Sequence, residues 1–180
     1  RTKEYMGMMD FGIFKDIVDQ AVESNCKFLT LASRGEPTLH KKFGKMLEYC
    51  KGKFLELKIN TNATKMSKEL SYEILEAGVN IVVFSVDSYY KEEYERIRAG
   101  GNFEKVLENI QKFCEIKLMN TKYHKTSTRV SGVYLDGIQS ESKFLDFWKN
   151  IVDTVTFTSA TPRWDTYNNS PMNPNKPCAN

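Results

Sequence analysis

Polar and charged side chains that could hold a zwitterionic ligand recur at four places along the sequence. These places are Gly35-Glu36-Pro37, Asn60 with Asn62, Ser85 with Asp87, and Arg98. A carboxylate such as Glu36 can bind an ammonium group, and a guanidinium such as that of Arg98 can bind a carboxylate. Asp87 can accept hydrogen bonds from ribose hydroxyls. Together the four places favour one site for a nucleotide that carries an amino acid.

Each of these segments also has a purely structural interpretation. Gly35-Glu36-Pro37 is typical of a turn, and the segment 60–62 can form an Asx-turn before the next helix. The segment 85–87 can cap a helix, and Arg98 lies in a stretch rich in lysine and glutamate that would face solvent. The ligand-binding interpretation depends on the recurrence of these groups at regular spacing.

Alternating apolar segments predict the elements that would position these residues. Strands are expected at 28–33, 55–60, 79–86, 128–135 and 154–159, with helices between them. The first of these strands is a nearly continuous apolar run, which is typical of a strand covered on both faces. Asp10, Ser67 and Asn102 are the expected N-caps of three helices.

The spacing of the strands predicts an α/β fold. Repeated βα units imply a parallel sheet of five strands with outer helices. The polar segments would then meet where the strands end, which is where parallel α/β folds carry their sites. An open or partial barrel fits this pattern, and a flavodoxin-like doubly wound sheet remains an alternative.

Composition limits the classes of partner and compartment. The 26 basic and 23 acidic residues give a net charge of +3, which argues against a nucleic-acid partner. The apolar run 81–84 is far shorter than the ~18 residues of a membrane span, so no membrane partner is expected. Cys26, Cys50 and Cys114 are expected to be buried, and the lack of a disulfide pattern or signal peptide predicts a cytoplasmic protein.

Four ordered segments resemble the radical S-adenosylmethionine (radical SAM) enzymes. Leu29–His40 resembles the GGEP segment of that family, Ile59–Ala63 its TNG-type strand end, and Phe84–Ser88 its S-x-D strand end. Tyr94–Ile110 resembles its R-x-G-x-F-x-x-V-x-x-N-I segment. The similarity is specific because all four occur in the family's order at βα spacing.

The resemblance implies a partial (β/α)6 TIM-like barrel and a set of residues that bind S-adenosylmethionine. Within Gly35-Glu36-Pro37, the Glu36 carboxylate and the backbone around Gly35 would hold the methionyl amino group. The other implied roles are carboxylate pairing by Arg98, ribose or carboxylate contacts by Ser85 and Asp87, pocket lining by Asn60 and Asn62, and adenine contact by the backbone around Val133.

The resemblance also implies a chemistry and partners. Similar enzymes reduce the sulfonium with a 4Fe–4S cluster, release methionine and form a 5′-deoxyadenosyl radical that abstracts hydrogen from a substrate. A peptide or carbohydrate substrate and an electron donor such as flavodoxin or ferredoxin are implied. The alternative function is that of a non-catalytic α/β nucleotide-binding module.

Two departures from the family pattern stand at the start of the chain and in the first motif. The cluster motif C-x3-C-x2-C is absent, and in the family it precedes the helix that here begins near Asp10. We therefore expect the first strand and the three cluster ligands to lie upstream of Arg1, and this sequence alone to be inactive. Arg34 replaces the first glycine of the GGEP segment.

The last residues are expected to leave the core domain. Residues 1–160 are predicted to form the barrel, and the segment 161–180, rich in proline and asparagine, to form a linker. Pro177-Cys178 resembles the start of the cysteine-rich extension called SPASM or twitch. The resemblance implies that Cys178 is a ligand of an auxiliary iron–sulfur cluster.

Overall fold

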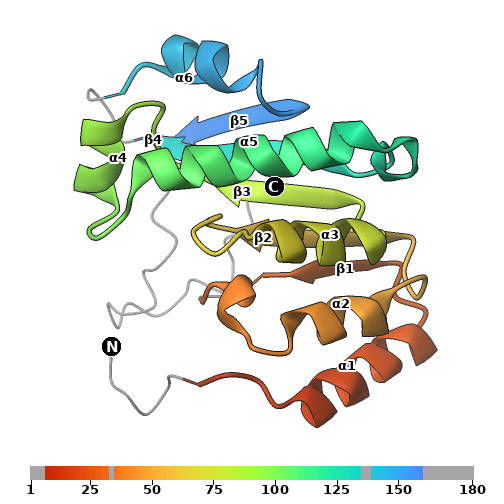
Figure 1. Cartoon of the computed structure of the whole chain (residues 1–180). Coiled ribbons are helices and arrows are strands. Elements are labelled where there is room, and N and C mark those ends of the chain that lie inside the picture. Colours follow the sequence, from red (N-terminus) through yellow and green to blue (C-terminus); the bar gives the residue numbers. More distant parts are fainter. Residues whose placement is uncertain (1–6, 33–34, 135–138, 160–180) are drawn as a thin grey trace, which may run out of the picture.

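A parallel sheet with helices packed along it dominates the computed structural model, which describes residues 7–32, 35–134 and 139–159 (Figure 1). The elements are α1 (Phe11–Glu23), β1 (Phe28–Leu31), η2 (Pro37–Leu39), α2 (Phe43–Cys50), β2 (Glu56–Thr61), α3 (Lys68–Glu76), β3 (Ile81–Ser85), α4 (Lys91–Ile97), α5 (Phe103–Met119), η3 (Thr121–Tyr123), β4 (Ser127–Tyr134), α6 (Glu141–Trp148) and β5 (Thr154–Ser159).

The three predicted N-caps are confirmed. The Asp10 carboxylate accepts hydrogen bonds from the backbone N–H groups of Gly12 and Ile13 at the start of α1. The Ser67 hydroxyl and the Asn102 side chain accept from the third N–H of α3 and α5 respectively. Each cap satisfies N–H groups that would otherwise have no partner within the helix, and so fixes where the helix begins.

The strands lie in sequence order and all neighbours are parallel, as predicted. The order is β1-β2-β3-β4-β5. At the two edges of the sheet, Leu31 of β1 lies opposite Ile59 of β2, and Val133 of β4 lies opposite Thr158 of β5. A doubly wound sheet reverses its strand order at a switch point. The sheet described here has no such reversal, so it belongs to the barrel-like alternative.

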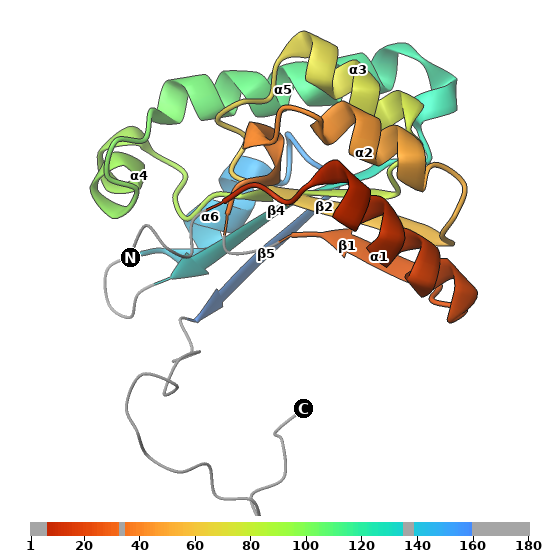
Figure 2. The same ribbon diagram turned by 90° about the horizontal axis from the view of Figure 1, so that it is seen from below.

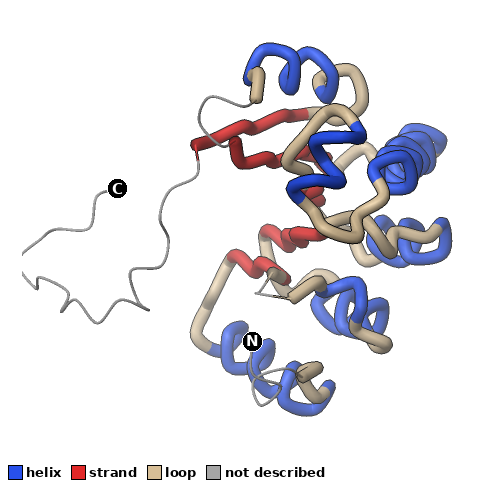
Figure 3. Tube along the Cα trace, turned by 90° about the vertical axis from the view of Figure 1, so that its left-hand side faces the viewer, coloured by secondary structure: helices blue, strands red, loops and turns tan. Residues whose placement is uncertain are grey.

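One face of the sheet is covered by helices and carries the core. In Figures 2 and 3 the helices lie outside the curved sheet, on its outer side. The side chains of Ile59, Phe84, Val130, Ile110 and Trp148 are fully buried in this layer. On the opposite side of the sheet, no helix of the described residues is present. No helix in the described part of the chain is long and apolar enough to cross a membrane.

Gly132 marks a close approach between the sheet and α6. A Cβ atom at this position would lie 2.6 Å from the Val86 carbonyl oxygen and 2.7 Å from the Phe144 ring. Phe144 in turn stacks on Phe157 with ring centroids 4.0 Å apart. Strands β4 and β5 and helix α6 therefore pack at a distance that only glycine allows.

Two sequence predictions about burial are wrong. Strand β1 is not covered on both faces: Phe28 and Thr30 are exposed while Leu29 and Leu31 are half-buried, and the strand lies at one edge of the described sheet. Cys26 is exposed, because it lies in the loop between α1 and β1 rather than on a helix face. Cys50 and Cys114 are buried as predicted, and burial raises the pKa of each thiol to about 11.

Candidate functional site

The Glu36 carboxylate connects the loop after β1 with the end of β2. Its Oε1 atom accepts hydrogen bonds from the Thr38 N–H (3.1 Å), the Thr38 hydroxyl (2.6 Å) and the Thr61 hydroxyl (2.7 Å). Its Oε2 atom accepts from the Asn62 N–H at 2.7 Å. Thr61 is buried, whereas Glu36, Thr38 and Asn62 are half-buried, so this carboxylate joins two strand ends at a partly shielded site.

The loop after β2 is held by its own side chains. Asn62 Oδ1 accepts from the Thr64 N–H (3.0 Å) and hydroxyl (2.7 Å), which is the Asx-turn that the sequence left as an alternative. The buried Asn109 side chain of α5 donates to the Ala63 carbonyl at 2.8 Å. Asn62 therefore has a structural role in this loop, whatever else it contacts.

Asn60 has a buried atom without a hydrogen-bond partner. Asn60 Oδ1 is the one buried side-chain oxygen or nitrogen, among the described residues, that has no hydrogen-bond partner. A buried acceptor that makes no hydrogen bond costs ~1–3 kcal/mol. The position is therefore suited to a donor supplied from outside the chain.

Asp87, Arg98 and Val133 are directly bonded to one another. Asp87 Oδ2 accepts from Arg98 Nε at 2.7 Å and from one Nη at 2.5 Å, and Asp87 Oδ1 accepts from the Val133 N–H at 3.1 Å. The Asp87 side chain is 13% exposed and that of Arg98 is 38% exposed. Three predicted site residues from two strand ends and from the end of α4 thus form one cluster.

A buried network fixes the loop that carries Asp87. The Ser88 hydroxyl donates to Glu93 Oε2 at 2.7 Å, and Gln139 donates both to that oxygen (3.3 Å) and to the Asp87 carbonyl (2.5 Å). The Trp148 indole donates to the Ser88 carbonyl at 3.2 Å. Sequence reasoning missed this network, because its partners are up to 60 residues apart and no local motif joins them.

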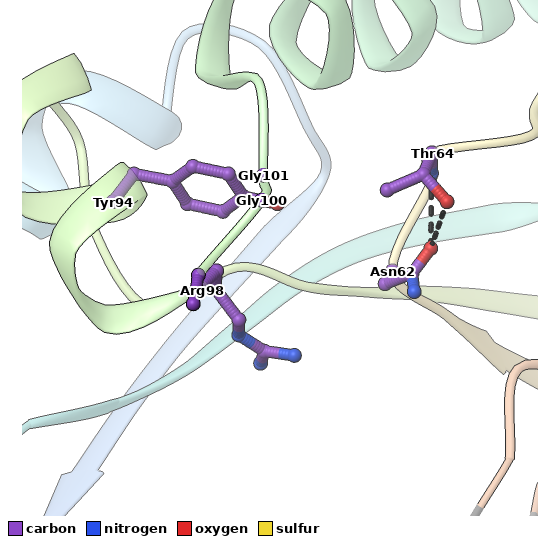
Figure 4. A pocket seen from close by; sticks show the side chains of 7 residues that line it. Asn62, Thr64, Tyr94, Arg98, Gly100 and Gly101 are labelled. Carbon is purple, nitrogen blue, oxygen red and sulfur yellow. Dashed lines mark hydrogen bonds between the residues drawn. The ribbon is translucent and has the colours of Figure 1, made fainter.

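A cavity of about 360 Å³ lies between the loop after β2 and the end of α4 (Figure 4). Asn62 and Thr64 line it on one side, and Tyr94 and Arg98 on the other. The segment 99–101 supplies the rest of the lining, and a Cβ atom on Gly101 would lie 2.8 Å from the Tyr94 ring. Asn62 of one bonded group and Arg98 of the other thus share one cavity.

The remaining predicted residues are placed as follows. Gly35 is exposed, and a Cβ atom on it would meet nothing within 4 Å. Pro37 begins η2, and Ser85 lies half-buried at the end of β3 opposite Ser131. The roles of all these residues toward a ligand stay predictions.

Some predictions fall outside the described residues. Cys178, Arg34 and the linker 161–180 are among them. Among the described residues, no group of three or more His, Cys, Asp or Glu side chains is placed to hold a metal ion.

Two curated proteins are similar to this chain in sequence. The tungsten-containing aldehyde ferredoxin oxidoreductase cofactor-modifying protein of Pyrococcus furiosus is 37% identical over 82 residues, which cover 45% of this chain and 23% of that protein. A probable GTP 3′,8-cyclase of Methanococcus maripaludis is 28% identical over 123 residues, which cover 68% of this chain and 41% of the relative.

Solved structures share the fold. SuiB of Streptococcus suis, bound to its precursor peptide SuiA, superposes with a TM-score of 0.70 at 18% identity, covering 87% of this chain and 34% of SuiB. The structure of SuiB bound to S-adenosylmethionine superposes equally well. This chain spans less than half the length of each of these proteins.

The family itself is settled by the extent of its match. The sequence family described as the Radical SAM superfamily matches residues 2–130, which is more than half of the chain. The matched region contains the Glu36 loop, the Asn60–Asn62 strand end and the Asp87–Arg98 pair. The chain therefore belongs to the radical SAM superfamily.

Proposed function

We propose that the intact protein is a radical SAM enzyme that binds S-adenosylmethionine where β1 to β4 end and acts on a peptide. One observation carries this proposal. The Glu36–Asn62 group and the Asp87–Arg98–Val133 group come from different strand ends, and each contributes one lining residue, Asn62 and Arg98, to a cavity of about 360 Å³. Cofactor sites of proteins are commonly ~300–1,000 Å³ in volume.

The amino group of S-adenosylmethionine would bind to Oε2 of Glu36. Each carboxylate oxygen offers about two acceptor positions. Oε1 already accepts three hydrogen bonds, whereas Oε2 accepts one, from Asn62. The open space beside Gly35 leaves room for the ligand to approach the backbone there.

The carboxylate of the same ligand would bind to Arg98. A guanidinium has five N–H donors, and Asp87 uses the Nε edge of this one. The second Nη group is available for the ligand, and Asp87 acts chiefly by orienting the guanidinium. The Val133 N–H is engaged by Asp87, so a contact between adenine and this residue would use the Val133 carbonyl.

The buried Oδ1 of Asn60 supports the fit of a ligand with N–H or O–H donors. S-adenosylmethionine has such donors on its ribose, its adenine and its amino group. Ser85 follows on the neighbouring strand, and we assign it to the same pocket on the basis of the family resemblance.

The bound cofactors would supply the radical chemistry. S-adenosylmethionine together with a 4Fe–4S cluster supplies a 5′-deoxyadenosyl radical, and we assign the cluster ligands to residues outside this sequence. We assign Cys178 to an auxiliary cluster in a SPASM-like or twitch-like extension that the linker 161–180 enters, and flavodoxin or ferredoxin as the electron donor. A peptide substrate is preferred over a carbohydrate because SuiB, which shares the fold, binds a precursor peptide.

Replacing Glu36 with alanine is expected to weaken S-adenosylmethionine binding by roughly ten-fold or more. A hydrogen bond to a charged group contributes ~1.5–3 kcal/mol, and ~1.4 kcal/mol corresponds to ten-fold in affinity. Calorimetric titration of the intact protein measures the change. Glu115→Ala, on the exposed side of α5, is the matched control and should bind as the unmodified protein does. Unchanged affinity in Glu36→Ala would refute the assignment.

The enzymatic part of the proposal has its own test. The intact protein, reconstituted anaerobically with iron and sulfide and then reduced, should convert S-adenosylmethionine to methionine and 5′-deoxyadenosine, as measured by chromatography. Binding of S-adenosylmethionine without 5′-deoxyadenosine would instead support the non-catalytic nucleotide-binding module.

A further inference from the structure

The side of the sheet away from the helices carries polar side chains and two cations. In β2, Leu57 and Ile59 are buried under the helices, so Lys58 and Asn60, which alternate with them along the strand, face the other way. The same alternation in β4 buries Val130 and turns Arg129 to the uncovered side. We call this side the open face. It is the concave side of the sheet in Figure 3, where no helix of the described residues covers it.

The strand register brings the open-face residues into rows. Lys58 lies opposite Ile81, and in the next row Asn60 lies opposite Val83, which lies opposite Arg129. Lys58 and Arg129 are thus two strands and one row apart, a separation that two long, flexible side chains can bridge. The next row, toward the proposed S-adenosylmethionine site, consists of residues with hydroxyl groups: Ser85, Ser131 and Thr156.

The two cations of this face have no acidic partner. Neither Lys58 nor Arg129 takes part in an ion pair within the described residues. Glu56 is the one carboxylate on the open face of the described strands, and it lies at the start of β2, opposite Phe28. Arg129 Nε donates to the Thr154 hydroxyl at 3.3 Å, which leaves the Nη edge of the guanidinium available.

Such an arrangement is complementary to a carboxylate. Both cations are half-buried, and a charge on a partly shielded face attracts an opposite charge more strongly than it would in bulk water. The free edge of a guanidinium matches the two oxygens of a carboxylate, and a lysine adds a third charged donor. The hydroxyl row can satisfy the backbone of an extended segment.

We propose that Lys58 and Arg129 bind an aspartate or glutamate side chain of the substrate, so that the enzyme selects an acidic peptide. This inference rests on the proposed peptide substrate and specifies its chemistry. Arg129 precedes Val133 by four residues along β4, or ~13 Å at ~3.3 Å per residue. The acidic side chain would therefore anchor the peptide a few residues away from the S-adenosylmethionine end of the barrel.

The test compares two capped pentapeptides on the intact protein saturated with S-adenosylmethionine. One has glutamate at its centre and alanine elsewhere, and the other has glutamine at its centre. Ligand-observed NMR at low salt should give about ten-fold or tighter binding of the glutamate peptide. Arg129→Gln and Lys58→Met should each reduce this preference, and Arg129→Lys should restore part of it. Lys68→Met, an exposed lysine of α3, is the control and should retain it.

A charge reversal separates recognition from folding. The double variant Lys58→Glu, Arg129→Glu should lose the preference for glutamate and favour a pentapeptide with lysine at its centre. Equal binding of the glutamate and glutamine peptides to the unmodified protein would overturn the inference. Displacement of the glutamate peptide by inorganic phosphate, at phosphate concentrations below the dissociation constant of the peptide, would also overturn it, because the site would then prefer a free anion to a peptide.

The binding of S-adenosylmethionine is measured in the same samples. If S-adenosylmethionine binds and the glutamate and glutamine peptides bind with equal affinity, the substrate inference fails and the proposed function stands. If S-adenosylmethionine does not bind but the peptides are distinguished, the proposed function fails and the anion site stands.

Discussion

Replacing Gly132 with alanine is expected to lower the free energy of unfolding by ~3 kcal/mol. The new Cβ atom would lie 2.6 Å from the Val86 carbonyl oxygen, which is backbone, and 2.7 to 2.8 Å from the rings of Phe144 and Phe157. Both rings are buried and stacked, so neither can move aside without disturbing the core. Overpacking of this kind typically costs ~1–3 kcal/mol, and a clash with backbone belongs at the upper end.

Urea unfolding of the intact protein measures this loss. Gly7→Ala is the matched control, because a Cβ atom at Gly7 meets nothing within 4 Å, and it should change stability by less than ~0.5 kcal/mol. If Gly132→Ala were as stable as the control, the close packing of α6 against β4 and β5 would be contradicted.

Replacing Asp153 with asparagine should destabilise the protein by ~2 kcal/mol at neutral pH. Asp153 Oδ2 accepts from the ammonium of Lys117 in α5 and from the N–H (2.7 Å) and hydroxyl (2.8 Å) of Thr128 in β4. Lys117 is 6% exposed and would be left without its counter-charge. Breaking a fully buried pair costs ~3–5 kcal/mol, and solvent screening reduces this figure because the Asp153 side chain is 45% exposed.

The loss should depend on pH. Burial alone would raise the pKa of the Asp153 carboxyl, but the hydrogen bonds from Lys117 and Thr128 outweigh burial and lower that pKa below its ordinary value of 3.8. A lowered folded-state pKa contributes stability above the unfolded-state value, and this contribution disappears as the pH falls through the folded-state value.

The stability difference between the unmodified protein and Asp153→Asn should therefore be constant near pH 7 and shrink below pH ~4. Thermal unfolding at a series of pH values measures it. Asp146→Asn, which breaks the exposed pair with Lys149, is the control and should have little effect at any pH. A difference that grows on acidification would contradict the assignment.

Local signals in the sequence were sufficient to predict the parallel sheet and its helix starts. Short polar side chains such as Asp10, Ser67 and Asn102 act on N–H groups only two or three residues away, so their effect can be inferred from the sequence alone. The strand positions follow from runs of apolar residues, and the parallel direction of the strands follows from the spacing of βα units. The strand order was left open between a partial barrel and a doubly wound sheet, and the structure decides it.

The pairing of the site residues could not be predicted, because it depends on distances across the fold. The sequence assigned Asp87 to a ribose and Arg98 to a ligand carboxylate, whereas the structure places the two in direct contact. It assigned Glu36 to an ammonium group, whereas four hydrogen bonds within the chain already bind its carboxylate. A residue type indicates what a side chain can bind, but not which neighbour reaches it first.

One prediction of burial was wrong because the strand concerned has a neighbouring strand on one side alone in the described sheet. The apolar composition of 28–33 predicted a covered strand, but Phe28 lies at the edge of the described sheet. Composition reports how apolar a strand is, and the number of its neighbours is set by the whole sheet.

The sequential order of the strands has a consequence for synthesis on the ribosome. Each strand of the described sheet pairs with the strand that precedes it, so a nascent chain can add one βα unit at a time to a surface that has already emerged. No pairing within this sheet has to wait for a distant later segment, which keeps loop closure short and limits the time that an apolar strand edge spends exposed. The widest interval is between β3 and β4, where Ile81 pairs with Ser127, and it is filled by α4 and α5, which can form helical turns before β4 arrives.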